Sequence, residues 1–406
     1  MKILFVLEDN FPESGACTSL VNNIIHSGGM IDKVSLVDVL AVKNKYLSRK
    51  TEKINGVTVY NCALLSKIPT WQYKCAIKQH PIKLSAIVLR KLFTFRNTGL
   101  IEKAVDKDNV KTIEKTIKDI KKKYDIIIAV MGRFDVAAAA VKHKKKNPDV
   151  KLIIYQVDPC SSNEMYSLSA REELKGKEKE IYNVSDKIIT TPILFDESKE
   201  KYSDEMINKI IPMEFPNVVP VDDGNREETS DIRCLFTGSI YGNFRDPKYT
   251  LKLFDKAELP IGFEVIGSVK PEVKSEFTKH SVLYHGPKPL EETKAELAKA
   301  DVLVNIGNDM LNQVPSKLFE YISYGKPIIN ICKNRNCPTI PYLEKYKYAL
   351  NLYEEDDIFE EQVKLLNDFI LENHKNRMTA DEILEAFETC TPQYCAGQMI
   401  EVFKTL

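Results

Sequence analysis

One short segment, residues 312–329, combines residue types that suit the binding of an anion. Its sequence, NQVPSKLFEYISYGKPII, predicts a helix that begins near Pro315 and ends at Gly325, followed at once by an apolar strand. Proline suits the first helical position, because its ring fixes φ and its missing N–H would have had no partner there. The other amides at a helix start stay unpaired and attract negative charge. The segment therefore predicts an anion site at the start of this helix.

Two charged side chains on the first turns of this helix fit an anionic ligand that also carries hydroxyl groups. A helical wheel gives one apolar side, formed by Val314, Leu318 and Ile322. Opposite to it lie Ser316, Glu320 and Ser323. The carboxylate of Glu320 either is simply solvated or accepts hydrogen bonds from two adjacent hydroxyls, such as those of a ribose. Lys317 has the same two interpretations, with phosphate as its functional partner.

Glycines follow two of the predicted strands in the second half of the chain. In FTGSIYGNFRDP, Gly238 and Ser239 come directly after an apolar run, and Arg245 lies a few residues later. Gly267 ends a second run in VIGS. Glycine at a strand end either lets the backbone approach a ligand closely or only forms a tight turn. Arg245 is either a phosphate ligand or half of a surface salt bridge, which usually contributes little stability.

An acidic residue in the first half of the chain could take part in proton transfer. Asp158 follows the apolar run KLIIYQV. It could deprotonate a hydroxyl, or it could cap the turn that follows. His143 stands beside three lysines and is interpreted as a solvated residue at a helix end. The sequence thus provides one candidate base outside the anion-binding segment.

The elements that must position these residues alternate between strands and helices. Apolar runs of strand length lie at residues 2–9, 124–132, 151–158, 186–192, 232–239, 263–268, 281–286, 301–308 and 326–332. Helical stretches separate these runs, and such alternation indicates parallel sheets. In parallel sheets a ligand binds at the carboxyl ends of the strands. The predicted fold class is therefore α/β, with two doubly wound parallel-sheet domains.

A polar, turn-forming stretch divides this pattern into two parts. We predict an N-terminal domain over residues 1–217, a linker over 218–231 and a C-terminal domain over 232–390. Residues 391–406 are predicted to form a C-terminal helix that can return to the N-terminal domain. At 406 residues the chain exceeds the size of one ordinary hydrophobic core, which also favours two domains.

The composition is that of a globular protein, with 43% hydrophobic and 29% charged residues. No apolar stretch reaches the length of a membrane span and no signal-peptide pattern follows Met1, so the expected location is the cytoplasm. The nine cysteines are scattered and are expected to be free thiols, although two pairs separated by four residues could also be interpreted as zinc ligands. We predict no metal site.

Charge is distributed unevenly along the chain, although the formal net charge is zero. Residues 1–150 hold 27 Lys and Arg against 14 Asp and Glu, a net charge of +13, so the remainder carries −13. This asymmetry predicts that the first domain faces an anionic surface or substrate.

The basic excess includes residues 53–101, where eight Lys and Arg stand without any acidic residue. Within this stretch, IKLSAIVLRKLFTF predicts a helix whose apolar side is edged by Lys83, Arg90 and Lys91. A basic amphipathic helix suits the boundary of an anionic membrane, whereas the alternative is an ordinary core-facing helix with solvated lysines. We predict peripheral docking on the inner face of the membrane and no binding of nucleic acid.

The segment VPSKLFEYISYGKPII resembles the donor-site signature of GT-B glycosyltransferases, in particular family 4, where a Pro-Ser-Lys-Leu helix leads into a Gly-Lys-Pro strand. LFTGSI, FEVIGS, LYHGPKPLEE and ADVLVNIG follow in a similar order, and VSDKIITTP and FPNVVP resemble the end of the first domain. The likeness is loose before about Val150. It implies a GT-B fold, with two doubly wound Rossmann-like domains facing across a cleft. It also implies transfer of a sugar from a nucleotide-sugar donor to an acceptor hydroxyl.

The resemblance further implies roles for individual residues. Glu320 would hold the ribose, and Gly267 would lie near the base. The amides around Ser316 and Lys317 would face the diphosphate, and Gly15 stands where the first loop of the family approaches it. The implied donor is UDP- or GDP-linked, with no cofactor and no metal. The expected acceptor is lipid-linked or a glycan, in cell-surface polysaccharide or glycolipid synthesis.

Two positions depart from the pattern of the family. The family often carries a second glutamate eight residues before Glu320, but this chain has Asn312 there, which leaves the donor sugar open. The family's arginine after the first glycine of the domain is Ser239 here, and Arg245 could replace it. Two alternatives therefore stay open: a sugar-nucleotide epimerase of the same fold, and a binding protein without turnover.

Overall fold

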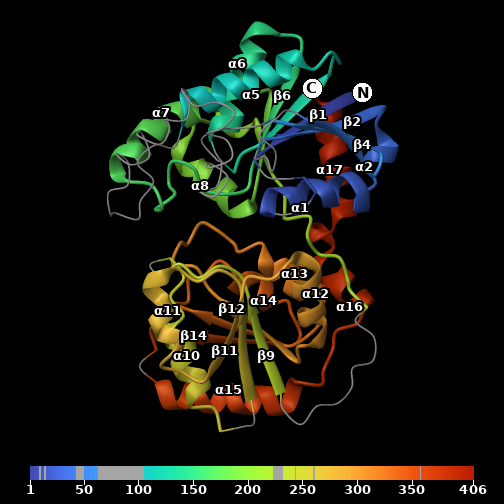
Figure 1. Ribbon diagram of the computed structural model, residues 1–406. Helices are drawn as coiled ribbons and strands as arrows, with labels where there is room; N and C mark the ends of the chain where they lie inside the picture. The colour runs from blue at the N-terminus through green and yellow to red at the C-terminus, as the bar shows by residue number, and fades with distance from the viewer. Residues whose placement is uncertain are drawn as a thin grey trace, which may run out of the picture. The chain divides into compact units, whose positions relative to one another are not determined.

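The computed structural model describes residues 1–8, 11–12, 15–42, 50–62, 105–132, 134–222, 232–242, 244–258, 261–356 and 358–406. These residues form two compact units (Figure 1). Unit 1 comprises Met1–Glu214 and Cys395–Leu406, and unit 2 comprises Phe215–Tyr394. The predicted docking residues Lys83, Arg90 and Lys91 lie outside the described residues. Within the described ranges, no helix combines the length and the apolar character that crossing a membrane requires.

Unit 1 is built on a sheet that has eight strands in the described residues, in the order β3-β4-β2-β1-β5-β6-β7-β8. The strands are β1 (Lys2–Leu7), β2 (Leu36–Ala41), β3 (Lys50–Ile54), β4 (Val57–Asn61), β5 (Ile126–Val130), β6 (Lys151–Gln156), β7 (Lys187–Thr190) and β8 (Ile210–Pro212). Neighbours pair in parallel except β3 and β4, which form a hairpin. Its turn, Asn55-Gly56, has positive φ at both positions, the geometry that matches the twist of the strands.

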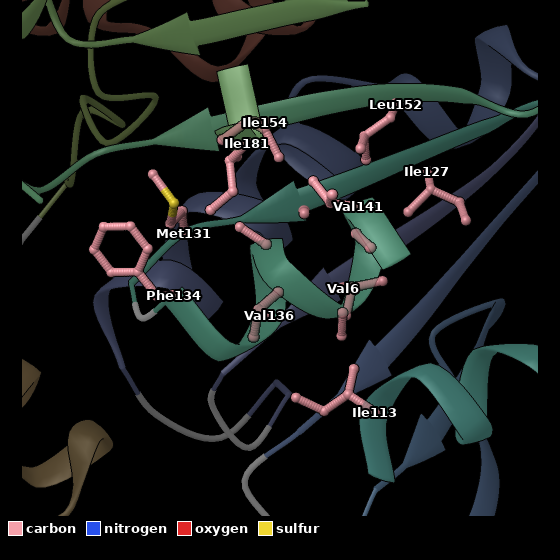
Figure 2. Close-up of a cluster of buried hydrophobic side chains, with 14 of the residues drawn as sticks. Val6, Ile113, Ile127, Met131, Phe134, Val136, Val141, Leu152, Ile154 and Ile181 are labelled. Atoms are coloured by element: carbon pink, nitrogen blue, oxygen red, sulfur yellow. The ribbon is translucent and has the colours of Figure 1, made fainter. Parts of the chain in front are cut away.

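Helices cover both faces of this sheet: Figure 1 shows α5 and α6 on one side and α1 and α2 on the other. The helices of unit 1 are α1 (Ala16–Asn22), α2 (Met30–Lys33), α5 (Lys107–Asp119), α6 (Phe134–Lys146), α7 (Leu168–Val184), α8 (Pro192–Lys201), α9 (Asp204–Ile207) and α17 (Pro392–Lys404), with a π-helical turn at Asn23–Ser27. In the core, Ile127 and Ile154 of the strands lie among Val136 and Val141 of α6 (Figure 2). The continuous apolar strands are thus buried on both faces, as parallel sheets require.

The end of the chain returns to unit 1. Helix α17 begins at Pro392, near the end of unit 2, and from Cys395 on it belongs to unit 1, where it contacts the last residue of β8 and the segment that follows. The side-chain amide of Gln398 donates to the carbonyl of Pro212 at 3.1 Å, and the thiol of Cys395 donates to the carbonyl of Glu214 at 3.5 Å. Unit 1 is therefore completed by the last twelve residues of the chain.

Unit 2 contains a fully parallel sheet, with six strands in its described part, in the order β11-β10-β9-β12-β13-β14. The strands are β9 (Ile232–Thr237), β10 (Ile261–Ile266), β11 (Val282–Gly286), β12 (Val302–Ile306), β13 (Ile328–Cys332) and β14 (Ala349–Tyr353). The helices are α10 (Lys248–Asp255), α11 (Pro271–Phe277), α12 (Leu290–Lys299), α13 (Lys317–Ser323), α14 (Ile340–Leu343), α15 (Phe359–Asn373) and α16 (Ala380–Phe387). The prediction of two doubly wound parallel-sheet domains is confirmed.

Both sheets reverse their strand order at one point. In unit 2 the chain moves outward from β9 through β10 and β11, then returns to the other side of β9 with β12. In unit 1 the same reversal lies between β1 and β5. Loops that leave the two strands at such a point diverge, and ligands bind there. The topology thus directs attention to the loops after β9 and β12.

A buried lysine holds the end of α12 in unit 2. Lys326 is fully buried, and its ammonium group donates to the carbonyls of Leu297, Ala298 and Ala300 at 2.9, 2.5 and 2.8 Å. Carbonyls in the last turn of a helix have no partner within the helix. The lysine of the Gly-Lys-Pro sequence therefore contributes to the fold by capping α12.

An ion network joins β9, β10, β11 and α12 in unit 2. Arg233 donates to both carboxylate oxygens of Glu264 at 2.6 and 2.8 Å, and to Glu296 at 2.9 Å. His285 lies 2.8 Å from Glu264. Desolvation by burial raises the pKa of Glu264, but the hydrogen bonds from Arg233 and His285 outweigh it, so the pKa lies below its usual value. The network therefore stabilises the charged form of Glu264.

Acidification should weaken this network. Because the pKa of Glu264 is lower in the folded state, its contribution is complete above the unfolded value of 4.5 and is lost as the pH falls through the folded pKa. Glu264→Gln should lower the free energy of unfolding by about 1.5–3 kcal/mol at neutral pH. Urea unfolding of both proteins should show this difference shrinking toward about pH 3. A difference that stays constant across this range would contradict the prediction.

Candidate functional site

Arg245 bridges the two loops that flank the reversal of strand order in unit 2. It lies in the loop after β9, and its Nη1 donates to the carbonyl of Ser239 in the same loop at 3.0 Å. Its Nη2 donates to Oδ1 of Asn308, in the loop after β12, at 2.5 Å. The guanidinium group thus lies at the place where doubly wound folds bind ligands.

The charge of Arg245 is not compensated by an acidic group. Among the described residues, no carboxylate forms an ion pair with it, and its Nε is enclosed without a hydrogen-bond partner. Burial lowers the pKa of its guanidinium group. Charges removed from water are normally paired, because their desolvation is costly. The site therefore favours an anion, and the described residues provide no acidic partner for the alternative of a surface salt bridge.

Gly238 and Gly267 lie against each other at the ends of β9 and β10. Both have positive φ, 153° and 148°. A Cβ atom added to Gly267 would lie 1.8 Å from the carbonyl oxygen of Gly238, a distance that no side chain tolerates. The amide of Gly238 donates to the carbonyl of Ile266 at 2.9 Å. Glycine is required at Gly267 by close packing of backbone on backbone. Its predicted place near the base of a donor stays a prediction.

The helix of the anion-binding segment begins later than predicted. Helix α13 starts at Lys317, and Pro315 precedes the cap residue, Ser316, whose side chain makes no capping hydrogen bond. The amide of Leu318 donates to the carbonyl of Pro315 at 3.0 Å, so the chain enters the helix through a tighter turn. The expectation that Pro315 occupies the first helical position is wrong by two residues.

Lys317 and Glu320 form an ion pair on the first turn of α13. Lys317 Nζ lies 2.5 Å from Glu320 Oε2, and both side chains are about 30% exposed. Each is therefore accessible to a ligand, and each neutralises the other while no ligand is bound. Arg245, by contrast, forms no such pair with any residue that the structure describes.

Ser323, which was predicted to lie on the same side of the helix as Glu320, is buried. Ser323 is 3% exposed, accepts a hydrogen bond from the amide of Val219 at 2.9 Å and donates to the carbonyl of Phe319 at 2.8 Å. The helical wheel placed Ser323 on the same side as Glu320, but unlike Glu320 it is covered by other parts of unit 2 and is not accessible to a ligand. The segment after Phe215 covers the end of α13, which a pattern within the helix cannot reveal.

Tyr321 fixes α13 to the end of β9. The amide of Thr237 donates to the Tyr321 hydroxyl oxygen at 2.7 Å, immediately before Gly238. Burial raises the pKa of this hydroxyl to about 12. The start of α13 and the loop that carries Ser239 and Arg245 are thus held in one arrangement.

Asn308 is a residue of this site that the sequence analysis did not name. It is buried, accepts from Arg245 and lies 3.5 Å from the side chain of Gln313. Asn312 is half-buried in the same loop between β12 and α13. The signal was available, since Asn308 is a polar residue directly after an apolar strand in VLVNIGN.

The two candidates of unit 1 lie at the carboxyl ends of its strands. Gly15 precedes α1 with φ of 115°, and its carbonyl accepts from the amide of Ser19 at 3.0 Å. Asp158 lies two residues after β6 and is half-buried, and its backbone carbonyl accepts from the side chain of Gln156 at 3.2 Å. Their predicted functions stay predictions.

The described cysteines, eight in number, are all free thiols. In the described ranges, no group of three or more His, Cys, Asp or Glu side chains could hold a metal ion. The expectation that the reaction needs no metal stays a prediction.

Comparison of the whole chain with solved structures identifies its fold. The lipopolysaccharide outer core galactosyltransferase WaaB aligns over 100% of both chains, with 15% identity and a TM-score of 0.59. Sucrose-phosphate synthase from Thermosynechococcus elongatus aligns over 100% of this chain and 99% of its own, with 11% identity and a TM-score of 0.66. HepE from Anabaena, in complex with UDP and glucose, aligns over 100% of both chains, with 11% identity and a TM-score of 0.61.

These similarities concern the fold. The chain has the GT-B fold that the sequence resemblance implied. No protein-family model matches the sequence, and no curated protein sequence matches it either.

Proposed function

We propose that this GT-B protein is a glycosyltransferase that moves a sugar from a nucleotide-sugar donor to an acceptor hydroxyl. The observation that carries the proposal is Arg245, a half-buried cation at the reversal of strand order in unit 2 that has no acidic partner among the described residues. A nucleotide-sugar diphosphate supplies the negative charge that this site lacks. HepE, a protein of the same fold, has been crystallised with UDP-glucose.

The proposed chemistry uses charge stabilisation by the protein. As the bond between the sugar and the diphosphate breaks, negative charge develops on the departing phosphate, and preorganised donors stabilise it. Arg245 is the main group that stabilises this charge. Helix α13 contributes less, because it has only seven residues and the pair of Lys317 and Glu320 partly neutralises its first turn. The acceptor oxygen forms the new bond to the sugar and loses its proton to a base, for which we propose Asp158.

Further assignments are part of the same proposal. We propose that Glu320 binds the ribose, that the donor is UDP- or GDP-linked, and that no metal is needed. The acceptor is proposed to be lipid-linked or a glycan, in cell-surface polysaccharide or glycolipid synthesis. Docking on an anionic membrane through Lys83, Arg90 and Lys91 would bring the protein to such an acceptor.

A panel of UDP- and GDP-sugars tests the proposal. Calorimetry should detect binding of at least one donor, and mass spectrometry should detect transfer of its sugar when acceptors are added. Binding of no donor would overturn the proposal. Conversion of a donor into an isomeric nucleotide sugar without any acceptor would identify an epimerase instead, and binding without any conversion would identify a nucleotide-sugar-binding protein.

Glu320→Ala should lower kcat/KM for the donor by roughly 10- to 100-fold. A hydrogen bond to a charged group contributes about 1.5–3 kcal/mol, and this change removes the group proposed to accept from the ribose. Stability should change little, because an exposed ion pair contributes about 0–1 kcal/mol.

Glu276→Ala provides a matched control for this change. Glu276 pairs with Lys279 at 2.9 Å, with the same spacing of three residues, but it lies in the last turn of α11. Steady-state kinetics should show near-normal turnover for this control. Equal losses in the two variants would contradict a specific role for Glu320.

A further inference from the structure

Unit 1 contains a cavity of about 390 Å³ between three of its helices, α5, α6 and α7. Its floor is apolar and is formed by Val105, Val110, Phe134, Ala138, Val141 and Ile181. Sites for small molecules usually measure roughly 300–1,000 Å³, so the cavity is large enough for a ligand. None of the residues that line it is among those assigned to the donor, the acceptor or the base.

The spacing of residues on α6 explains why the cavity exists. Phe134, Ala138, Val141 and Lys145 recur every three or four residues and therefore form one stripe along the helix. The small side chain of Ala138 lies in the middle of this stripe and leaves space between the neighbouring helices α5 and α7. Phe134, Val141 and Ile181 belong to the buried core, where Figure 2 shows their side chains. The cavity thus leads from the surface down to the core.

The rim of the cavity is basic. Five lysines line it: Lys107, Lys111, Lys142, Lys145 and Lys177. The acidic residue among the lining residues, Glu180, lies 2.5 Å from Lys145 and is neutralised by it. Lys177 pairs with Glu173, and Lys142 lies 3.9 Å from Glu114.

Two of these lysines are available to a ligand. Lys107 and Lys111 lie on the first turns of α5, are exposed, and form no ion pair with any carboxylate of the described chain. They stand beside Val105 and Val110 of the floor. An apolar floor with unpaired cations at its edge complements a molecule that has a hydrocarbon chain and an anionic head.

We propose that this cavity binds one anionic phospholipid, with an acyl chain on the floor and the phosphate group at Lys107 and Lys111. The strong basic excess of residues 1–150 fits the same kind of ligand, because it raises the local concentration of anions. The inference does not depend on the proposed sugar transfer. The proposed lipid site lies in unit 1 and consists of residues that the structure describes. It does not include the predicted docking residues Lys83, Arg90 and Lys91.

The experiment titrates the full-length protein with lysophosphatidic acid below its micellar concentration. Lysophosphatidylcholine, which keeps the chain but has no net charge, and glycerol phosphate, which has no chain, are the comparison ligands. Lysophosphatidic acid should bind in a saturable manner with one molecule per chain, and the two others at least about tenfold more weakly. No saturable binding of lysophosphatidic acid would overturn the proposal.

Two pairs of charge changes on the same helix separate this site from general electrostatic attraction. Lys107→Gln with Lys111→Gln should weaken binding at least about tenfold, whereas Lys115→Gln with Lys118→Gln, also exposed on α5 but not among the residues that line the cavity, should leave it nearly unchanged. Equal weakening by both pairs would overturn the proposal. So would binding to vesicles of phosphatidylglycerol without any binding of the single lipid.

Filling the cavity tests the acyl-chain part of the proposal. Ala138→Phe should abolish binding of lysophosphatidic acid, because the ring would occupy the floor while the lysines remain. Ala138→Leu adds a smaller side chain and should weaken binding at least about tenfold. It replaces Ala138→Phe in the experiment if that variant does not fold. Thermal unfolding identifies which variants are folded. A folded variant of either kind that binds the lipid normally would overturn the proposal.

Discussion

Arg245→Met should lower kcat/KM for the nucleotide sugar by about 10²- to 10³-fold. This is the usual effect of removing one hydrogen-bonding group that stabilises developing negative charge. The change removes the cation that bridges Ser239 and Asn308. Steady-state kinetics with the donor that binds best in the panel measures the effect. Retained turnover would contradict the assignment of Arg245 to the diphosphate.

The same substitution should leave stability unchanged or increase it, which separates function from fold. Arg245 is desolvated without an acidic partner, so its charge opposes folding, and an apolar side chain of similar length removes that cost. Arg335→Met is the control, since Arg335 is 62% exposed and pairs with Asp356 at 2.7 Å. It should change neither turnover nor the urea midpoint appreciably. Loss of stability together with loss of activity would contradict this prediction, because it would mean that Arg245 mainly holds the two loops together.

The order of elements could be predicted because buried parallel strands are continuous apolar runs. The runs at 2–9, 124–132 and 301–308 correspond to β1, β5 and β12. Such strands are buried on both faces, so hydrophobicity alone marks them. The same argument located the second sheet and hence the loops after its strands, where Gly238, Ser239 and Gly267 lie.

Strand β2 escaped prediction because a charged residue interrupts it. Asp38 is fully buried in the middle of LVDVLA. Its carboxylate accepts from Lys122 at 2.7 Å and from the hydroxyl of Tyr124 at 2.6 Å, both more than eighty residues away in the sequence. A buried carboxylate is tolerated only with such partners, and a local pattern cannot supply them.

Other strands were missed for different reasons. Strand β8 has only three residues, so it shows no pattern. The hairpin of β3 and β4 could have been predicted, because an Asn-Gly pair between alternating strands is a strong hairpin signal. This signal is local, unlike the partners of Asp38.

The contacts that assemble the donor site are long-range, which limits what the sequence can show. Tyr321 reaches Thr237 across 84 residues, and Arg245 reaches Asn308 across 63. Lys326 belongs to the segment that resembles the family signature, and its ammonium group caps α12. The motif therefore predicts where the candidate site lies, whereas packing shows which of its side chains stabilise the fold.

Gly267→Ala should destabilise unit 2 by about 3 kcal/mol or more and abolish donor binding. The new Cβ would lie 1.8 Å from the carbonyl oxygen of Gly238, so one of the two loops must move. Overpacking usually costs about 1–3 kcal/mol, and the positive φ of Gly267 adds strain for any other residue. The loop that moves carries Ser239 and leads to Arg245, so the bridge to Asn308 should be lost as well. Urea unfolding and calorimetry with the donor measure the two effects.

Gly262→Ala is the control for this prediction, because Gly262 lies in β10, the strand that Gly267 directly follows. A Cβ atom at Gly262 meets no atom within 4 Å, and its φ is not positive. Alanine costs less conformational entropy than glycine within a strand, so this variant should be as stable as the parent or about 0.5–1 kcal/mol more stable. Its donor affinity should be normal. If Gly267→Ala behaved like Gly262→Ala, the two loops would not be packed backbone on backbone, and the glycine after β10 would be an ordinary turn residue.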